Sequence, residues 1–305
     1  MKRLALLTSL IFFTGLLVPI ESFPWGEDGH ILITQKAIGM LPEAMRPLFE
    51  SNAAELARLS NVPDKEWKAK PEYKERNAWH YLDIDLFDYG YPFNDFPRDR
   101  QAADKLYKQK EKKAGYLPWT IEDFYRKLVE AFKKADGDAI IENAGLISHF
   151  AGDSTMPLHA TRNYNGKFSG NLYYKVPWNA PEYVDKGIHQ RFELGLLKHR
   201  LEDYMREIET TRDDLQPIDN VIEHAFAVIV DSYWHIDYLI YFDKVISKDL
   251  GITVELQSFQ NHREAYYDLL DKHLGWLVVR QLKAGALYLG NLWFSAWQEA
   301  GRPQL

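Results

Sequence analysis

The sequence predicts a single all-α domain, and three observations support that prediction. Apolar residues recur at helical spacing through most of the chain, no useful length alternates between apolar and polar residues, and no internal repeat or low-complexity linker divides it. The composition is globular, because 46% of the 305 residues are hydrophobic and 14% are aromatic, which is ample material for one core. We therefore expect roughly eight to ten helices packed in one unit.

In the first half of the chain, apolar repeats are separated by breaks in the pattern. Pro42 separates the first two repeats, and Thr120 with Asp123 forms a capping pattern at the start of the fourth. Residues 81–100 mix prolines, glycine and aromatics without a period and should form a loop. The helices predicted here span residues 29–41, 42–59, 99–113, 120–135 and 138–153.

The second half begins with a long irregular segment, residues 163–187, and then becomes helical again. The predicted helices span residues 193–211, 217–243 and 261–300, and the last two are strongly apolar.

The N-terminus has the order of a secretory signal. Lys2 and Arg3 precede an apolar run over residues 4–20. We therefore expect residues 1–24 to be a signal peptide and residues 25–305 to be the mature domain, exported to a periplasm or outside the cell. An uncleaved membrane anchor is the alternative, because the run is close to the ~18 residues that suggest a membrane span.

Cysteine content and charge exclude several classes of protein. The chain has no cysteine, which rules out disulfides, thiolate metal sites, iron–sulfur clusters and a thiol nucleophile. Its formal charge of −7 argues against a broad basic surface for nucleic acid, so any such role needs a small, locally positive site.

Five histidines alternate with carboxylates at spacings typical of metal ligands. His149 and Asp153 are four residues apart, as are His189 and Glu193, so each pair should project from one face of a helix. Imidazole with carboxylate suits zinc. A single pair at this spacing is more often a surface ion pair or a core histidine, and spacing alone leaves both interpretations open. We expect structural roles for the remaining histidines, which are His199, His224, His235 beside Asp231, His262 and His273.

The order of these residues resembles the superfamily of zinc-dependent phospholipase C and the fungal-type single-strand-specific nucleases. The matching residues are Trp25, His30, Asp64, His80, His149, Asp153, His159, His189 and Glu193. The match to the bacterial branch runs from about Trp25 to the end of the chain and includes the stretches HFAGDSTMPLHA and NLWFSAWQEAG. The resemblance implies a single all-α domain.

The resemblance also implies three zinc ions and hydrolysis of a phosphodiester. The ligand sets carried over are Asp64, His80, His149 and Asp153 for one ion, Trp25 and His30 with a bridging Asp153 for the second, and His159, His189 and Glu193 for the third. Asp64 is the candidate general base for the attacking water. The expected partner is a phospholipid or a single-stranded nucleic acid, bound by a monomer that needs no obligate protein partner.

The ligand role of Trp25 depends on how the chain is processed. The resemblance assigns its α-amine and carbonyl to a metal, yet cleavage after Ser22 would leave Phe23 and Pro24 ahead of it and turn that amine into an amide. We therefore expect Trp25 to become the true N-terminus.

The choice between the two activities stays open. Glu193 and the absence of cysteine favour a phospholipase C, whereas Asn171 in its Ser-Gly-Asn context is nuclease-like. Lys65 stands where a choline-binding lipase has an aromatic, and Trp67 stands where the nucleases tend to have an arginine. The sequence leans to a phospholipase C-type enzyme, with a single-strand-specific endonuclease as the alternative and a catalytically silent, zinc-stabilised binding protein as a third possibility. Lys65 and Asn171 are the candidate substrate contacts.

Overall fold

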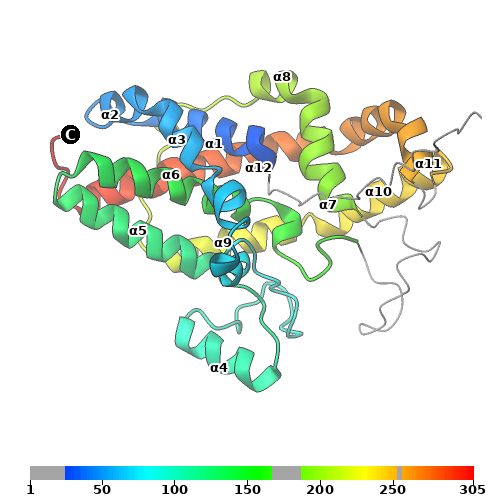
Figure 1. Cartoon of the computed structure of the whole chain (residues 1–305), viewed down its shortest axis with the longest axis horizontal. Coiled ribbons are helices and arrows are strands. Elements are labelled where there is room, and N and C mark those ends of the chain that lie inside the picture. The colour runs from blue at the N-terminus through cyan, green and yellow to red at the C-terminus, as the bar shows by residue number, and fades with distance from the viewer. Residues whose placement is uncertain (1–24, 167–186, 253–255) are drawn as a thin grey trace, which may run out of the picture.

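The computed structural model describes residues 25–166, 187–252 and 256–305, and within these ranges it is helical without β-strands. A single isolated bridge joins Leu82 to Gly115. The expected all-α fold is thereby confirmed (Figure 1). The α-helices are α1 (Gly26–Met40), α2 (Arg46–Ser51), α3 (Ala53–Leu59), α4 (Arg100–Lys110), α5 (Leu117–Lys133), α6 (Gly137–Ser154), α7 (Ile188–Gln190), α8 (Leu197–Glu207), α9 (Val221–Tyr233), α10 (Ile236–Asp249), α11 (Leu256–Asn261) and α12 (Arg263–Glu299).

Five shorter helical turns connect these helices. Three are 3₁₀ turns and two are π-helical turns. The 3₁₀ turns are η2 (Pro71–Trp79), η3 (Pro157–His159) and η5 (Arg212–Asp214), and the π-helical turns are η1 (Pro63–Trp67) and η4 (Arg191–Leu196).

The C-terminal helix α12 is the longest element of the core. Its 37 residues extend for about 55 Å at 1.5 Å per residue, and they run along the long axis of the molecule (Figure 1). It packs against α1, α5, α6, α8 and α10. Near its C-terminal end Trp293 is fully buried against Phe49, with ring centroids 4.9 Å apart.

Helix α6 lies at the centre of the bundle, where it packs against α1, α3, α5 and α12. Asp136 caps its first turn, because its carboxylate accepts a hydrogen bond from the backbone N–H of Ala139 at 3.1 Å. From Ala144 to Ser154 every residue is buried. A stretch buried on all sides can hold polar groups only if they are matched, which makes its two ionisable residues, His149 and Asp153, informative.

The described residues form twelve α-helices instead of the expected eight to ten, because two predicted helices are split and the short helices α7 and α11 were not predicted. The segment 42–59 breaks at Asn52, whose side-chain amide donates to the Leu48 carbonyl at 2.8 Å and so competes with the helical backbone pattern. The segment 217–243 breaks at Trp234 and His235, and the chain turns there so that α10 can follow α12.

The predicted cap at Thr120 is wrong. Helix α5 begins at Leu117, with Pro118 in its first turn, so Thr120 already lies inside the helix. Its hydroxyl donates back to the Tyr116 carbonyl at 3.0 Å.

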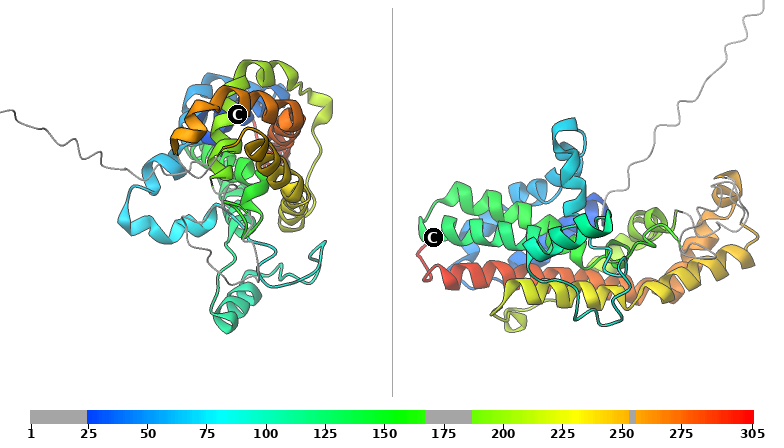
Figure 2. Two further views of the ribbon diagram at one scale, coloured as in Figure 1. Left: turned by 90° about the vertical axis from the view of Figure 1, so that its right-hand side faces the viewer. Right: turned by 90° about the horizontal axis from the view of Figure 1, so that it is seen from below.

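The loop expected over residues 81–100 is irregular, and the helix after it is capped by Asp99. This helix, α4, stands away from the main body in Figure 1 and in the left view of Figure 2. The expected signal peptide and most of the irregular segment 163–187 lie outside the described residues. In the described ranges no helix combines the length and the apolar character needed to cross a membrane.

Candidate metal centre

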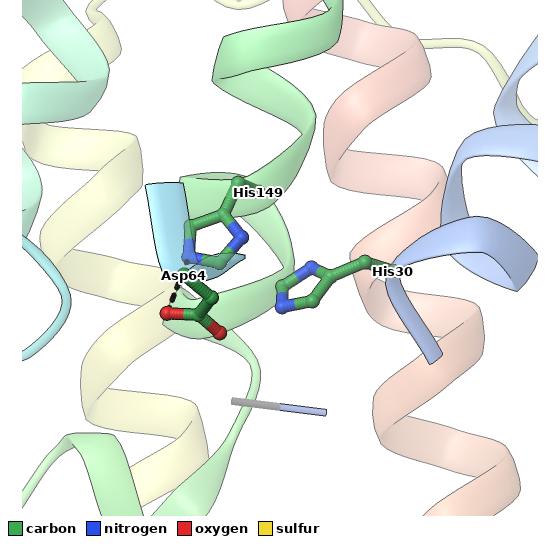
Figure 3. Close-up of side chains that lie close together, drawn as sticks. All are labelled: His30, Asp64 and His149. Atoms are coloured by element: carbon green, nitrogen blue, oxygen red, sulfur yellow. Dashed lines mark ion pairs between the residues drawn. The ribbon is translucent and has the colours of Figure 1, made fainter. Parts of the chain in front are cut away.

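The fold brings eight of the predicted ligands together as three buried clusters. Within each cluster, one ligand atom of every member lies within 4.8 Å of the others. The clusters are His30 with Asp64 and His149, His80 with His149 and Asp153, and His159 with His189 and Glu193. Figure 3 shows the first of them, with His30 projecting from α1 and His149 from α6 toward Asp64.

Asp153 belongs to the second cluster and also faces His30 of the first. Its Oδ2 lies 3.0 Å from His80 Nδ1 and 3.2 Å from His149 Nε2. Its Oδ1 faces the other way, 3.6 Å from His30 Nε2 and 3.7 Å from His159 Nδ1. One carboxylate therefore presents its two oxygens to different histidines, which is the arrangement of a bridging ligand.

Asp64 completes this part of the centre. Its Oδ1 lies 3.6 Å from His80 Nδ1 and 3.6 Å from His149 Nε2. A four-coordinate zinc with bonds near 2.1 Å holds its ligand atoms about 3.4 Å apart. The separations around Asp64 and Asp153 are close to that value.

The third cluster is built from η3, α7 and η4. His159 Nε2 and His189 Nε2 face each other at 3.2 Å, and Glu193 Oε2 lies 3.0 Å from His189 Nε2. Two imidazole nitrogens at this distance need a proton or a cation between them.

Backbone carbonyls orient two of the histidines. His149 Nδ1 donates to the Ser60 carbonyl at 2.8 Å, and His159 Nδ1 donates to the His80 carbonyl at 2.7 Å, since a carbonyl can only accept. Each bond leaves the Nε2 lone pair directed into the centre, as in known metal sites.

Burial changes the pKa values of these groups. It raises the pKa of Asp64 to about 6 and raises those of Asp153 and Glu193 above their usual range, and it lowers the pKa values of His80 and His159. Asp153 Oδ1 and Glu193 Oε1 are buried without a hydrogen-bond donor in the described part of the chain. Neutral imidazoles beside buried, unsatisfied carboxylates are a donor set that fits divalent cations.

Both π-helical turns carry a predicted ligand. Asp64 lies in η1, and Glu193 lies in η4. A π turn rotates the following side chains relative to an α-helix, and such turns occur frequently at functional sites. Here they direct the carboxylates of Asp64 and Glu193 into the centre from two distant segments of the chain.

Arg191, between the ligands His189 and Glu193, ties η4 to the helices behind it. Its Nε and one terminal nitrogen donate to the two carboxylate oxygens of Asp243 on α10, at 2.8 and 2.7 Å. Tyr266 on α12 donates its hydroxyl to the same carboxylate. Asp243 is fully buried, and its charge raises the pKa of Arg191 further above its usual range.

Lys68 is a residue that the sequence did not single out as a site residue. Its ammonium lies 2.6 Å from Asp64 Oδ1, and its side chain is only 18% exposed. The available signal was the four-residue spacing from Asp64, but a lysine in a charged stretch is usually solvated. In the structure it places a positive charge beside the centre.

The remaining predicted residues have different outcomes. Trp25 is fully buried at the start of α1, beside Phe192, and the ligand role of its amine stays a prediction. Lys65 forms a half-exposed ion pair with Glu27 at the surface. Asn171 lies outside the described residues.

The histidines expected to be structural lie outside the three clusters. Asp231 pairs with Arg280 at 2.8 Å and not with His235, and His199 pairs with Asp268 at 2.9 Å. His224 stacks on Tyr288, and His273 stacks on Phe242. The Nδ1 of His262 lies within hydrogen-bond distance of the Ser258 carbonyl.

An all-α bundle enclosing clustered histidines and carboxylates defines the class of helical metal-site proteins. A model of the family described as S1/P1 nuclease matches residues 25–236, and the chain belongs to that family.

Three similar proteins were also found. A protein of Bradyrhizobium tropiciagri described as a probable serine protease is 23% identical over 195 residues, which are 61% of this chain and 24% of that protein. The alpha toxin from Clostridium absonum is 18% identical, with a TM-score of 0.42, covering 87% of this chain and 64% of that one. An alpha-toxin of Clostridium perfringens is 14% identical, with a TM-score of 0.42, covering 88% and 64%. The chain thus spans about a quarter of the first protein and less than two thirds of the toxins.

Proposed function

We propose that this protein is a zinc-dependent phosphodiesterase that cleaves single-stranded nucleic acid. The observation that carries the proposal is the sharing of Asp153, whose two oxygens face separate histidines within a buried centre. Paired metals bridged in this way are suited to in-line displacement at phosphorus. The family match over residues 25–236 supports nucleic acid as the substrate, although the sequence by itself leaned to a phospholipid.

Of the three ligand sets proposed from the sequence, His159, His189 and Glu193 form one observed cluster. The other two sets draw on members of the first two clusters, in which His30 lies with Asp64 and His149. Asp64, His80, His149 and Asp153 would hold one zinc ion, His30 and the N-terminal amine of Trp25 would share Asp153 with a second, and the cluster of His159, His189 and Glu193 would hold the third. When bound, the ions would lower the pKa of a water molecule and neutralise charge on the phosphate.

Asp64 is our candidate for the general base. Its carboxylate is buried, and burial raises its pKa to about 6, which is closer to neutrality than the usual value of an aspartate. Lys68 holds one of its oxygens at 2.6 Å and so fixes the direction of the other. The same ammonium provides a positive charge that would attract a phosphate into this otherwise acidic protein.

An exposed ring next to the centre supports a substrate with bases. Tyr164 is 52% exposed, and its ring centroid lies 5.9 Å from that of His189. A base on either side of the scissile phosphate could stack on such a ring. Lys65 and Asn171 remain proposed substrate contacts.

A phospholipase C-type activity is the second candidate. The observations in its favour are the final ligand Glu193 and the absence of cysteine, both of which resemble the bacterial phospholipase branch. A serine nucleophile, which the name of the Bradyrhizobium relative would suggest, finds less support. The hydroxyls of the buried serines next to the ligands all donate to backbone carbonyls. These bonds are Ser60 to Ala57, Ser148 to Ala144 and Ser154 to Ala151.

We further propose that residues 1–24 direct export and are removed, that residues 25–305 are one monomeric domain in a periplasm or outside the cell, and that the mature chain begins at Trp25. Intact mass of the exported protein tests the last point. A fully active form that begins at Phe23 would contradict it.

A paired product assay tests the activity. Zinc-loaded protein beginning at Trp25 is incubated with single-stranded DNA and RNA in one sample and with phospholipid vesicles in the other, and products are identified by mass. Nucleotides with a terminal phosphate are the expected products. Diacylglycerol with a phosphorylated head group would instead establish the phospholipase. Failure on both substrates would favour the silent binding protein.

A further inference from the structure

Large aromatic side chains gather on a surface formed by the loop 81–100, the turn between α9 and α10, and the helices α10 and α12. Among the described residues eight large hydrophobic side chains are exposed, and five of them lie here. We call Tyr91, Trp234, Tyr238, Tyr241 and Trp276 the aromatic patch, and their exposed fractions range from 42% to 66%.

The members of the aromatic patch are neighbours in space. The rings of Tyr91 and Trp234 have centroids 5.3 Å apart, and those of Tyr238 and Trp276 are 6.1 Å apart. Tyr238 and Tyr241 are three residues apart and line one face at the start of α10, and Trp234 lies in the turn just before that helix. Trp276 joins them from α12, which packs along α10 (Figure 2, right).

Leaving these rings in water is costly. Aromatic side chains at half exposure present about 100 Å² each, so the aromatic patch exposes on the order of 500 Å². That is near the upper end of what a monomer shows in one place, and such patches commonly mark binding surfaces.

The charges around the aromatic patch are arranged for an anionic partner. Lys244 lies three residues after Tyr241 and Lys272 lies four before Trp276, so both flank the rings on their own helices. Both lysines are exposed, and no ion pair is found for either within the described residues. Two acids are also near: Asp231 pairs with Arg280 at 2.8 Å, and the exposed Asp237, three residues after Trp234, has an interaction partner as well.

The orientation of the rings favours a bilayer surface over a strand of bases. Tyr238 and Tyr241 meet Phe242 at 68° and 86°, and Tyr238 meets Trp276 at 59°, so neighbouring rings cover part of one another's faces. Base stacking requires open ring faces. Tryptophan and tyrosine are instead the residues that sit at the head-group level of a membrane, where nearby lysines meet anionic lipids.

We propose that the aromatic patch docks the protein on the surface of an anionic phospholipid bilayer. The contact is peripheral: the rings enter the head-group region, and Lys244 and Lys272 pair with lipid phosphates. None of the five patch residues belongs to the three ligand clusters, so the proposal does not depend on which phosphodiester the enzyme cleaves.

Vesicle co-sedimentation with the zinc-loaded chain tests this proposal. Vesicles of phosphatidylcholine mixed with phosphatidylglycerol should bind the protein, pure phosphatidylcholine should bind it less, and added salt should weaken binding. The double variant Trp234→Ser/Trp276→Ser should partition about tenfold more weakly or worse. Lys244→Gln/Lys272→Gln should remove the preference for phosphatidylglycerol.

Matched controls come from exposed residues elsewhere. Met205→Ser removes an exposed apolar side chain on α8, and Lys108→Gln/Lys110→Gln removes two lysines from α4, so both should bind like the parent. Vesicles with brominated acyl chains should also quench the tryptophan emission of the parent, a test that needs no substitution. Absence of binding and quenching would overturn the proposal. So would a tryptophan variant that keeps vesicle binding but loses affinity for a single-stranded oligonucleotide, because the surface would then bind nucleic acid.

Discussion

Gly152 is the point at which α6 comes closest to the candidate ligand His30. A Cβ atom at this position would lie 2.8 Å from His30 Nδ1 and 3.0 Å from its Cε1. To restore an ordinary contact of 3.4 Å, the His30 ring would have to move by about 0.6 Å. Metal–ligand distances tolerate about 0.2 Å, so Gly152→Ala should weaken zinc binding by about 10- to 100-fold, or about 1.4–2.7 kcal/mol.

Gly285 provides a matched control for this substitution. A Cβ there would lie 2.9 Å from Ile33 Cδ1 and 3.0 Å from Thr155 Oγ1, neither of which belongs to the centre. Both glycines are helical, so each alanine gains about 1 kcal/mol of helix propensity and loses about 1–3 kcal/mol to overpacking. Gly152→Ala and Gly285→Ala should therefore have similar melting temperatures without zinc and differ in zinc affinity.

The assay is zinc content by elemental analysis after dialysis against a graded series of zinc buffers, with melting temperatures measured before and after chelation. The expected result is parental zinc binding in Gly285→Ala and weakened binding in Gly152→Ala. Parental affinity and stoichiometry in Gly152→Ala would refute the reasoning, because His30 would then not be a ligand held against α6 as described.

Three further predictions concern the carboxylates. Asp64→Asn should lower turnover by about 10²–10⁴-fold while most zinc stays bound. A product assay and metal analysis on the same sample measure both quantities. Loss of zinc in parallel with activity would mean that Asp64 is only a ligand. Burial raises the pKa of Asp83 to about 8. The folded protein therefore retains a proton there that the unfolded chain releases near pH 4. As a result, the free energy of unfolding decreases as pH rises between about 4 and 8. Asp83→Asn should therefore gain melting temperature relative to the parent across that interval, and a constant difference would contradict this. Arg191→Met leaves Asp243 buried without its cation and should lower the free energy of unfolding by about 3–5 kcal/mol in urea titrations, whereas a loss below about 1 kcal/mol would mean that the pair is not buried in solution.

The parts of the site that follow from local periodicity could be predicted from the sequence. His149 and Asp153 share a face of α6 because four residues nearly complete a helical turn, and their ligand atoms lie 3.2 Å apart. His189 and Glu193 keep the same relation, at 3.0 Å, even though the second lies in a π-helical turn. The all-α class followed in the same way from repeated apolar faces.

Features that depend on packing between distant segments could not be predicted. Arg191 and Asp243 are 52 residues apart, and their pairing becomes visible only when η4 lies against α10. Lys68 reads as one of several lysines until η1 places it on Asp64. At Asn52 the side-chain amide competes with the backbone for hydrogen bonds of the helix. A hydrophobic pattern does not determine whether the helix continues or breaks there.

The position of α12 in the bundle has a consequence for the order of events during synthesis. Helices α1 and α6 carry three of the eight clustered ligands, namely His30, His149 and Asp153, and both helices pack on residues 263–299. While the ribosome is still adding that segment, the apolar faces of these two helices lack their partner, and a nascent chain cannot hold His30 against His149. The proposed capture of zinc therefore requires the finished polypeptide, and chains that end before α12 should not assemble the three ligand clusters.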